Sequence, residues 1–160
     1  MLSVTVLCVG RLKEGYWREA SAEYLKRLGA FCRPSMIEVE EARVPENPSA
    51  AQIAAALALE GKRLLAKLPA GAVLTALCIE GRELSSTQLA EKLERWTVEG
   101  ISHVALVIGG SWGLSEEVKR AASLRLSMSP MTFPHQMARV MLLEQVYRAM
   151  QIRHGGKYHK

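Results

Sequence analysis

The chain contains no aspartate, so all 16 of its acidic residues are glutamates. Metal sites and catalytic triads that use an aspartate would need a glutamate in its place. Cysteine is also scarce: Cys8, Cys32 and Cys78 are odd in number and lie far apart in the sequence. This pattern indicates buried thiols of a reducing compartment and gives neither a disulfide framework nor a metal-ligand spacing. We therefore expect no bound metal.

A long hydrophobic run and a basic N-terminal leader are missing as well. No stretch approaches the roughly 20 apolar residues that cross a membrane, and Met1 passes directly into an apolar run without the leader of a secretory signal. The 160 residues are 49% hydrophobic and 23% charged, which is the composition of an ordinary globular domain. We expect one domain over residues 1–160 and a cytoplasmic location.

The charge is distributed unevenly along the chain. Residues 1–117 hold 13 Lys or Arg and 15 Glu, whereas residues 118–160 hold 8 Lys or Arg and only Glu144, a net charge of +7. A basic end of this kind favours a polyanionic partner, with nucleic acid preferred over a membrane surface. A basic face that is merely solvated is the alternative.

Apolar patterning predicts five strands that alternate with five helices. This order favours an α/β fold with a mainly parallel sheet and helices on both faces. Ligands of such sheets bind beyond the carboxyl ends of the strands, so the loops after Val9, Ile79, Ile108 and Met128 are the places to search. The expected strands cover 3–9, 36–40, 72–79, 103–108 and 124–128; the expected helices cover 16–31, 49–68, 85–98, 115–122 and 134–152.

The loop after the first strand lacks the signatures of common nucleotide folds. Residues 10–15 read GRLKEG, which has neither the GxGxxG glycines nor the Lys-Ser/Thr pair of a P-loop. A conventional dinucleotide-binding site is therefore not expected there.

The loop after the fourth strand reads GGSWGLS and contains a formal GxSxG centred on Ser111. A nucleophile elbow occurs in this context, but the absent aspartate and the short chain disfavour a serine hydrolase. A tight turn that needs glycine, followed by a helix capped at Ser115, is a second interpretation. A third is that the glycines let a flat, adenosine-type ligand approach the backbone.

The last expected helix and the tail after it carry most of the remaining polar signals. His135 and Arg139 are four residues apart, as are Glu144 and Arg148, so each pair shares a helix face. A plain surface ion pair is the simpler interpretation of the second pair. Residues 153–160 combine two His, one Tyr and several cations, which fits RNA contact or proton abstraction better than metal binding.

Three separated motifs, LVIGGSWGLS, LSMSPMTFPHQMARVMLLEQVYRA and the terminal GGKYHK, occur in an order and spacing that closely resemble the ribosomal RNA large subunit methyltransferase H family. This is a group of small SPOUT methyltransferases. The resemblance covers essentially the whole chain, including VLCVGRLKEGYW near the N-terminus and LCIEGRELSS after the third strand.

The resemblance implies a C-terminal trefoil knot, an obligate homodimer and S-adenosylmethionine as cofactor. It also implies methylation of N3 of a pseudouridine in the 23S ribosomal RNA of assembled ribosomes. The cofactor contacts that it implies are Leu77, Gly110, Ser129, Pro130, Met131, Thr132, Phe133 and Pro134, with Gly109 supporting the glycine turn.

Within this interpretation the tail supplies the catalytic residues: His159 is the expected general base, and Tyr158 orients or stacks on the target. The expected RNA contacts are His135, Arg139, Arg148, Arg153, Lys157 and Lys160. One subunit would hold the cofactor while the tail of the other positions the RNA. A ribosome-binding protein without catalytic activity is the alternative function.

Overall fold

The structure, a computed structural model, describes residues 1–160 and confirms the predicted alternation of strands and helices. Its strands are β1 (Ser3–Val9), β2 (Arg33–Val39), β3 (Val73–Glu83), β4 (His103–Ile108) and β5 (Leu124–Ser127). Its helices are α1 (Gly15–Leu28), α2 (Ala50–Ala66), α3 (Ser86–Val98), α4 (Glu116–Ala121) and α5 (His135–Arg153).

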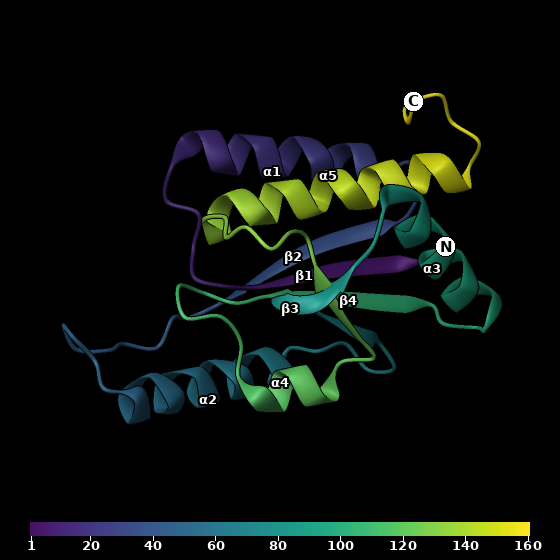
Figure 1. The fold of residues 1–160 in the computed structure, drawn as a ribbon. Coiled ribbons are helices and arrows are strands. Elements are labelled where there is room, and N and C mark those ends of the chain that lie inside the picture. Colours follow the sequence, from purple (N-terminus) through teal and green to yellow (C-terminus); the bar gives the residue numbers. More distant parts are fainter.

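All strand pairs are parallel, in the order β2-β1-β4-β3-β5. Helices α1 and α5 lie side by side on one face of this sheet, and α2 and α4 cover the other (Figure 1). Helix α3 packs against α5. Each face has its own apolar cluster, the larger one beneath α1, α3 and α5. The predicted α/β fold with a helix-flanked parallel sheet is therefore confirmed.

Two element boundaries near the N-terminus differ from the prediction. Helix α1 ends at Leu28, because Gly29 caps it, and β2 begins at Arg33, where we expected Met36. Pro34 lies inside this strand, although proline cannot donate a hydrogen bond to a β-ladder. The structure tolerates it because β2 is at the edge of the sheet and pairs only with β1.

Strand β3 runs four residues beyond the predicted end at Ile79. Leu126 of β5 pairs with Leu77 before this extension and with Arg82 within it, so the chain between them curves around β5. The passage is tight: a Cβ on Gly81 would lie 2.8 Å from backbone atoms of Arg125 and Leu126. The trefoil knot that the resemblance implies stays a prediction.

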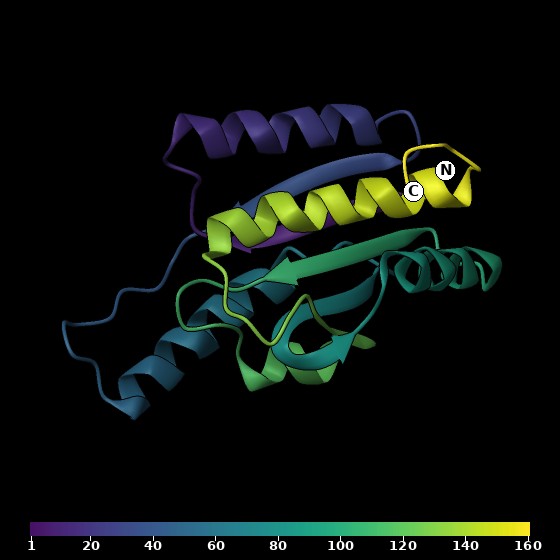
Figure 2. The same cartoon turned by 45° about the horizontal axis from the view of Figure 1, so that its top comes forward.

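The helices start where polar caps satisfy their free N–H groups. Ser49 Oγ and Ser85 Oγ each accept a hydrogen bond from the backbone N–H of the glutamine three residues on. In both capping boxes the backbone N–H of the serine donates to the side-chain oxygen of that glutamine. Ser115 caps α4 as predicted. After α5 the tail turns back along the helix (Figure 2), with Gly156 N donating to Gln151 O at 2.8 Å. None of the helices has the length and apolarity needed to span a bilayer.

Candidate active site

A cavity of about 820 Å³ opens at the carboxyl ends of β3, β4 and β5. This is the edge of the sheet at which the parallel topology predicts ligand binding. Residues 77–80 of β3, the loops after β4 and β5, and the start of α5 form most of its wall, and α4 adds Lys119. The lining residues are 77–80, 108–114, 119, 128, 129, 131–136 and 138.

The loop after β4 is a closed turn that only glycine can form. Gly110 and Gly113 make an isolated bridge, in which Gly113 N donates to Gly110 O at 3.1 Å. Gly113 has φ +86°, and a Cβ on Gly109 would overlap the carbonyl group of Gly113. The turn therefore presents bare backbone to the cavity, as approach of a flat ligand requires.

The loop between β5 and α5 is held by its own hydrogen bonds. Ser127 Oγ donates to Ser129 O at 3.2 Å, and Met131 N donates to Ser129 Oγ at 3.0 Å. Pro130 and Pro134 restrict the backbone further, and Pro134 occupies the N-cap of α5. This wall of the cavity is thus shaped before any ligand arrives.

Eight of the nine predicted cofactor residues line this one cavity, although they come from strand β3 and two separate loops. The exception is Pro130, which is exposed and outside the lining. Whether each residue contacts the cofactor stays a prediction. The residues that the structure brings together are Leu77, Gly109, Gly110, Ser129, Met131, Thr132, Phe133 and Pro134.

Among the lining residues that were not predicted as site residues are Cys78, Ile79, Glu80, Trp112 and Lys119. The first four adjoin the loops that the strand-end argument selected, so that argument could have found them. Lys119 had no such signal, because it reaches the cavity from α4. Its ammonium group pairs with Glu80, and this hydrogen bond raises the pKa of Lys119 and lowers the pKa of Glu80.

The formal GxSxG motif does not assemble a hydrolase site. Ser111 is exposed at the tip of the glycine turn, and no hydrogen bond joins it to a histidine. Without a histidine partner, Ser111 lacks the base that activates a serine nucleophile. The glycines serve the turn.

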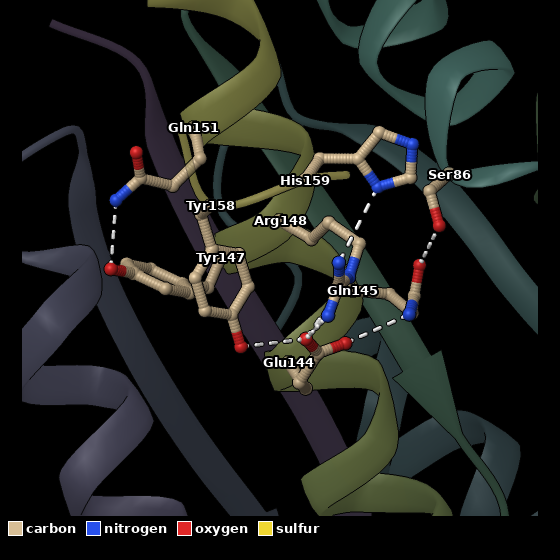
Figure 3. Close-up of polar contacts among 8 residues, drawn as sticks. All are labelled: Ser86, Glu144, Gln145, Tyr147, Arg148, Gln151, Tyr158 and His159. Carbon is tan, nitrogen blue, oxygen red and sulfur yellow. Dashed lines mark hydrogen bonds and ion pairs between the residues drawn. The ribbon is translucent and has the colours of Figure 1, made fainter. Parts of the chain in front are cut away.

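A second polar cluster lies on α5 and gathers around the carboxylate of Glu144 (Figure 3). Arg148 donates to Oε1 of this carboxylate from Nε at 3.1 Å and from Nη2 at 2.7 Å, and the tail residue Tyr158 donates its hydroxyl at 3.0 Å. Gln145 donates to Oε2 at 2.8 Å and is itself held by Ser86 Oγ at 2.6 Å. One carboxylate therefore anchors both α5 and the tail.

Aromatic packing fixes the tail on the helix as well. The Tyr158 ring meets Tyr147 edge-on at 4.9 Å, and the Arg148 guanidinium lies over the Tyr158 ring at 4.6 Å. Partial burial, followed by the bond to Glu144, raises the pKa of Tyr158, so its hydroxyl remains a donor. Beyond it, His159 Nδ1 lies 3.4 Å from Arg148 Nη1.

The predicted RNA contact at Arg139 is wrong in this fold, because that side chain is buried. Only 1% of Arg139 is exposed; it donates to Glu38 at 2.6 Å and to the carbonyl of Gly10 at 3.1 Å. It ties α5 to the ends of β1 and β2. The helical spacing predicted that Arg139 shares a face of the helix with His135. It did not indicate that this face packs against the sheet.

The other predicted RNA contacts differ in whether their side chains are exposed or already engaged in hydrogen bonds. Lys157 and Lys160 are exposed, whereas Arg153 is bound to Glu94 at 2.8 Å and to Thr97 at 3.1 Å. Arg148 is engaged with Glu144 and remains a quarter exposed. His135 lines the cavity, where burial and then the nearby Arg139 lower its pKa.

The expected catalytic residues do not lie in the large cavity of their own chain. Tyr158 and His159 are held beside Glu144, nine residues along α5 from His135, or about 13 Å at 1.5 Å per residue. Glu144 lines a second cavity of about 440 Å³, which meets the first at Met128. The chain therefore carries two candidate half-sites.

Comparison with known proteins identifies relatives over the full length. A family model described as "Predicted SPOUT methyltransferase" matches residues 2–159. A ribosomal RNA large subunit methyltransferase H from Pelotomaculum thermopropionicum is 50% identical over 159 residues, covering 99% of both chains. One from Bifidobacterium animalis subsp. lactis is 46% identical over 159 residues, covering 99% of this chain and 100% of its own.

Solved structures share the fold at low sequence identity. A probable methylase family protein from Haemophilus influenzae Rd KW20 superposes with a TM-score of 0.54 at 14% identity, covering 99% of this chain and 70% of that one. A tRNA (m1G37) methyltransferase from Aquifex aeolicus gives 0.52 at 11% identity, covering 92% and 69%. These two likenesses concern the arrangement of strands and helices alone.

Proposed function

The chain belongs to the SPOUT methyltransferase family, and from this premise we propose that it methylates N3 of a pseudouridine in 23S ribosomal RNA, acting on assembled ribosomes. Both relatives named above are ribosomal RNA large subunit methyltransferases, and they match this chain over nearly its whole length. A single domain over residues 1–160 would then supply both the cofactor site and the tail. Work on ribosomes would place the enzyme in the cytoplasm.

The large cavity fits S-adenosylmethionine. Its volume of about 820 Å³ lies in the range of cofactor sites, and its walls are apolar with a few polar groups. The glycine turn has no room for a Cβ at Gly109, which leaves backbone available for close contact. When bound, S-adenosylmethionine supplies a methyl group on a sulfonium centre. Leu77, Gly110 and the loop 129–134 would hold it.

The task left to the protein is to take the N3 proton and to orient the base. His159 suits the first role. Arginine donates hydrogen bonds and accepts none, so the contact from Arg148 Nη1 makes Nδ1 the acceptor nitrogen of the neutral His159 ring. This contact is long, at 3.4 Å, so the N3–H group could replace Arg148 as the donor, and Nδ1 would then take the N3 proton. The electron pair left on N3 would accept the methyl group that the cofactor would supply.

Two copies of the chain would complete the site. Tyr158 and His159 lie away from the large cavity of their own chain, and the rim of that cavity exposes the apolar side chains of Ile79, Trp112 and Met131. A second copy would cover this rim and bring its own tail to the cofactor. We propose a homodimer with one cofactor site and one tail in each composite centre.

The observation that carries the proposal is the convergence of the predicted cofactor residues on one cavity in a chain 50% identical to a ribosomal RNA methyltransferase. The test is transfer of labelled methyl from S-adenosylmethionine to ribosomes that lack the modification, with nuclease mapping of the product. Label at N3 of one pseudouridine is the expected result. Absence of both transfer and cofactor binding would instead favour a non-catalytic ribosome-binding protein.

Composite sites are tested with mixed dimers. A subunit altered in the cofactor cavity (Gly109→Ala) is paired with one lacking the tail histidine (His159→Ala). The hybrid retains one intact centre, so about half the wild-type activity per dimer is expected. No activity in the hybrid, at a dimer content equal to wild type in sedimentation, would contradict sharing.

A further inference from the structure

Three polar groups near the tail form a row whose hydrogen-bonding capacity alternates. The Glu144 carboxylate accepts from Arg148 at 2.7 Å, and the Arg148 guanidinium lies 3.4 Å from His159 Nδ1 (Figure 3). The order along the row is acceptor, donor, acceptor. Each member is at least partly accessible: 18% of the Glu144 and 25% of the Arg148 side chain are exposed, and His159 is exposed.

Each member also keeps free capacity. A guanidinium has five N–H groups. Two of those on Arg148 go to Glu144 and one to His159, which leaves two for another acceptor. Glu144 Oε2 receives only Gln145, so it can accept again. His159 Nδ1 has a single lone pair, and its 3.4 Å contact with Arg148 is long, so an N–H of the substrate can take the place of Arg148.

The row is rigidly supported, which recognition requires. The Tyr158 ring lies beneath the guanidinium at 4.6 Å. Behind the carboxylate, Ser86 on α3 fixes Gln145, which in turn fixes Oε2 of Glu144. These supports restrict the directions in which the free acceptor and donors point.

Pseudouridine presents the matching pattern on one edge of its ring. Because its glycosidic bond is to carbon, N1 keeps a hydrogen, and the edge N1–H, C2=O, N3–H reads donor, acceptor, donor. When uridine is placed with N3 and its glycosidic bond in the same positions, that edge reads C5–H, C4=O, N3–H. The two bases therefore differ at one end of the edge.

We propose that Glu144, Arg148 and His159 read this edge, with Glu144 accepting from N1–H, and that Glu144 thereby makes the enzyme select pseudouridine over uridine. The proposal rests on the methyltransferase function above. Arg148 donates to C2=O, and His159 faces N3–H. The row belongs to one chain, so the assignment is the same whether the methyl group comes from that chain or its partner.

The expected preference for pseudouridine over uridine depends on how exposed Glu144 is to water. A fully buried site that loses a hydrogen bond to its substrate can discriminate by about 10⁴-fold or more. Glu144 is partly open to water, which can replace a missing N1–H. A hydrogen bond to a charged group then gives a preference of about tenfold to a hundredfold.

The test compares kcat/KM on ribosomes that carry pseudouridine at the target with ribosomes from cells lacking the pseudouridine synthase, which carry uridine. Wild type should prefer pseudouridine by at least tenfold. Glu144→Met should bring the ratio within about threefold of one, and Glu144→Gln, which keeps an oxygen acceptor without the charge, should fall between. Loosening of the tail lowers activity on both substrates, so it cancels in the ratio.

Glu91→Met is the matched control, because it removes an exposed carboxylate of α3 that forms no ion pair and leaves the row and its supports in place. Its ratio should stay within twofold of wild type. An unchanged ratio in Glu144→Met, or a wild-type enzyme without preference, would overturn the proposal. Wild-type inactivity on both ribosomes would overturn the methyltransferase function instead, so the two failures are distinguishable.

Discussion

The two half-sites of this chain are built from different materials. The large cavity depends on backbone: a glycine turn without space for a Cβ at Gly109, and a proline-stiffened loop before α5. The cluster on α5 depends on side chains, since Glu144 alone gathers Arg148, Gln145 and Tyr158. The large cavity suits a ligand that is the same in every catalytic cycle. The cluster on α5 suits discrimination among bases.

This difference predicts how each half-site responds to substitution. Substitutions in the glycine turn that preserve the backbone should change the affinity for the cofactor little. An added atom that faces the Gly110–Gly113 bridge should weaken cofactor binding strongly. In the α5 cluster, loss of one polar atom should have a graded effect, because the remaining partners can still hold the group.

The largest effect is expected at the backbone-built site. A Cβ at Gly109 would overlap the main chain of Gly113, which cannot move without opening the Gly110–Gly113 bridge. Gly109→Ala should weaken S-adenosylmethionine binding in calorimetry by at least about a hundredfold, equivalent to the roughly 3 kcal/mol that misplaced backbone costs. Ser111→Ala, in the same turn, is the control and should change the Kd by less than twofold. Near-normal binding by Gly109→Ala would show that the turn does not shape the site.

The next effect concerns the buried ion pair that holds α5 to the sheet. Glu38→Gln leaves the Arg139 charge with a neutral partner, at a side chain that is 2% exposed. We expect a loss of about 2 kcal/mol in the free energy of unfolding, below the range for fully buried pairs because a third of Glu38 is exposed.

Urea denaturation measures this loss. The control is Glu23→Gln, which removes the exposed i,i+4 pair with Arg27 and should leave the free energy of unfolding almost unchanged. Equal losses for the two variants would contradict the structural role of Arg139. A normal salt dependence of ribosome binding in a stable Arg139 variant would separately agree with its burial.

A smaller effect separates free from engaged cations at the C-terminus. Lys157 is exposed, and its replacement by alanine should reduce the slope of log K against log salt for ribosome binding by about 1 if it contacts a phosphate. Arg153 is bound to Glu94 and Thr97, so Arg153→Ala should leave the slope unchanged and lower stability slightly. A reduced slope for Arg153→Ala would mean that RNA replaces these partners.

Much of the fold was predictable from local pattern, and the reasons are specific. Apolar runs ended by glycine located β1 and β4, and the capping serines Ser49 and Ser85 located the starts of α2 and α3. The start of β2 and the end of β3 were missed because tertiary pairing determines them: Pro34 is tolerated at a sheet edge, and Arg82 is extended because it pairs with β5.

The cofactor side of the site was predictable to the same extent. Parallel topology brings strand ends together, so the loops at Gly109 and Ser129 follow from the order of elements. The cluster around Glu144 did not follow, because it requires Tyr158 to return along α5. The spacing of Glu144 and Arg148 predicted their ion pair but gave no indication of the tail residue above it. Likewise, helical spacing grouped Arg139 with His135 without revealing which face is buried.

The smallest expected effect concerns His135, which lines the cavity at the start of α5. Burial, then the Arg139 charge, lowers its pKa from the usual value near 6.5, so the folded protein binds this proton less readily than the unfolded chain. Its contribution to stability is complete above about pH 6.5 and is lost as the pH falls through the lowered pKa. The negative charge of Glu41, on the loop after β2, opposes this lowering of the pKa, so the loss of stability should be small. Urea midpoints from pH 7.5 to 5 should fall less steeply in His135→Gln than in wild type. Parallel curves would mean that His135 titrates normally and that the start of α5 is open to water.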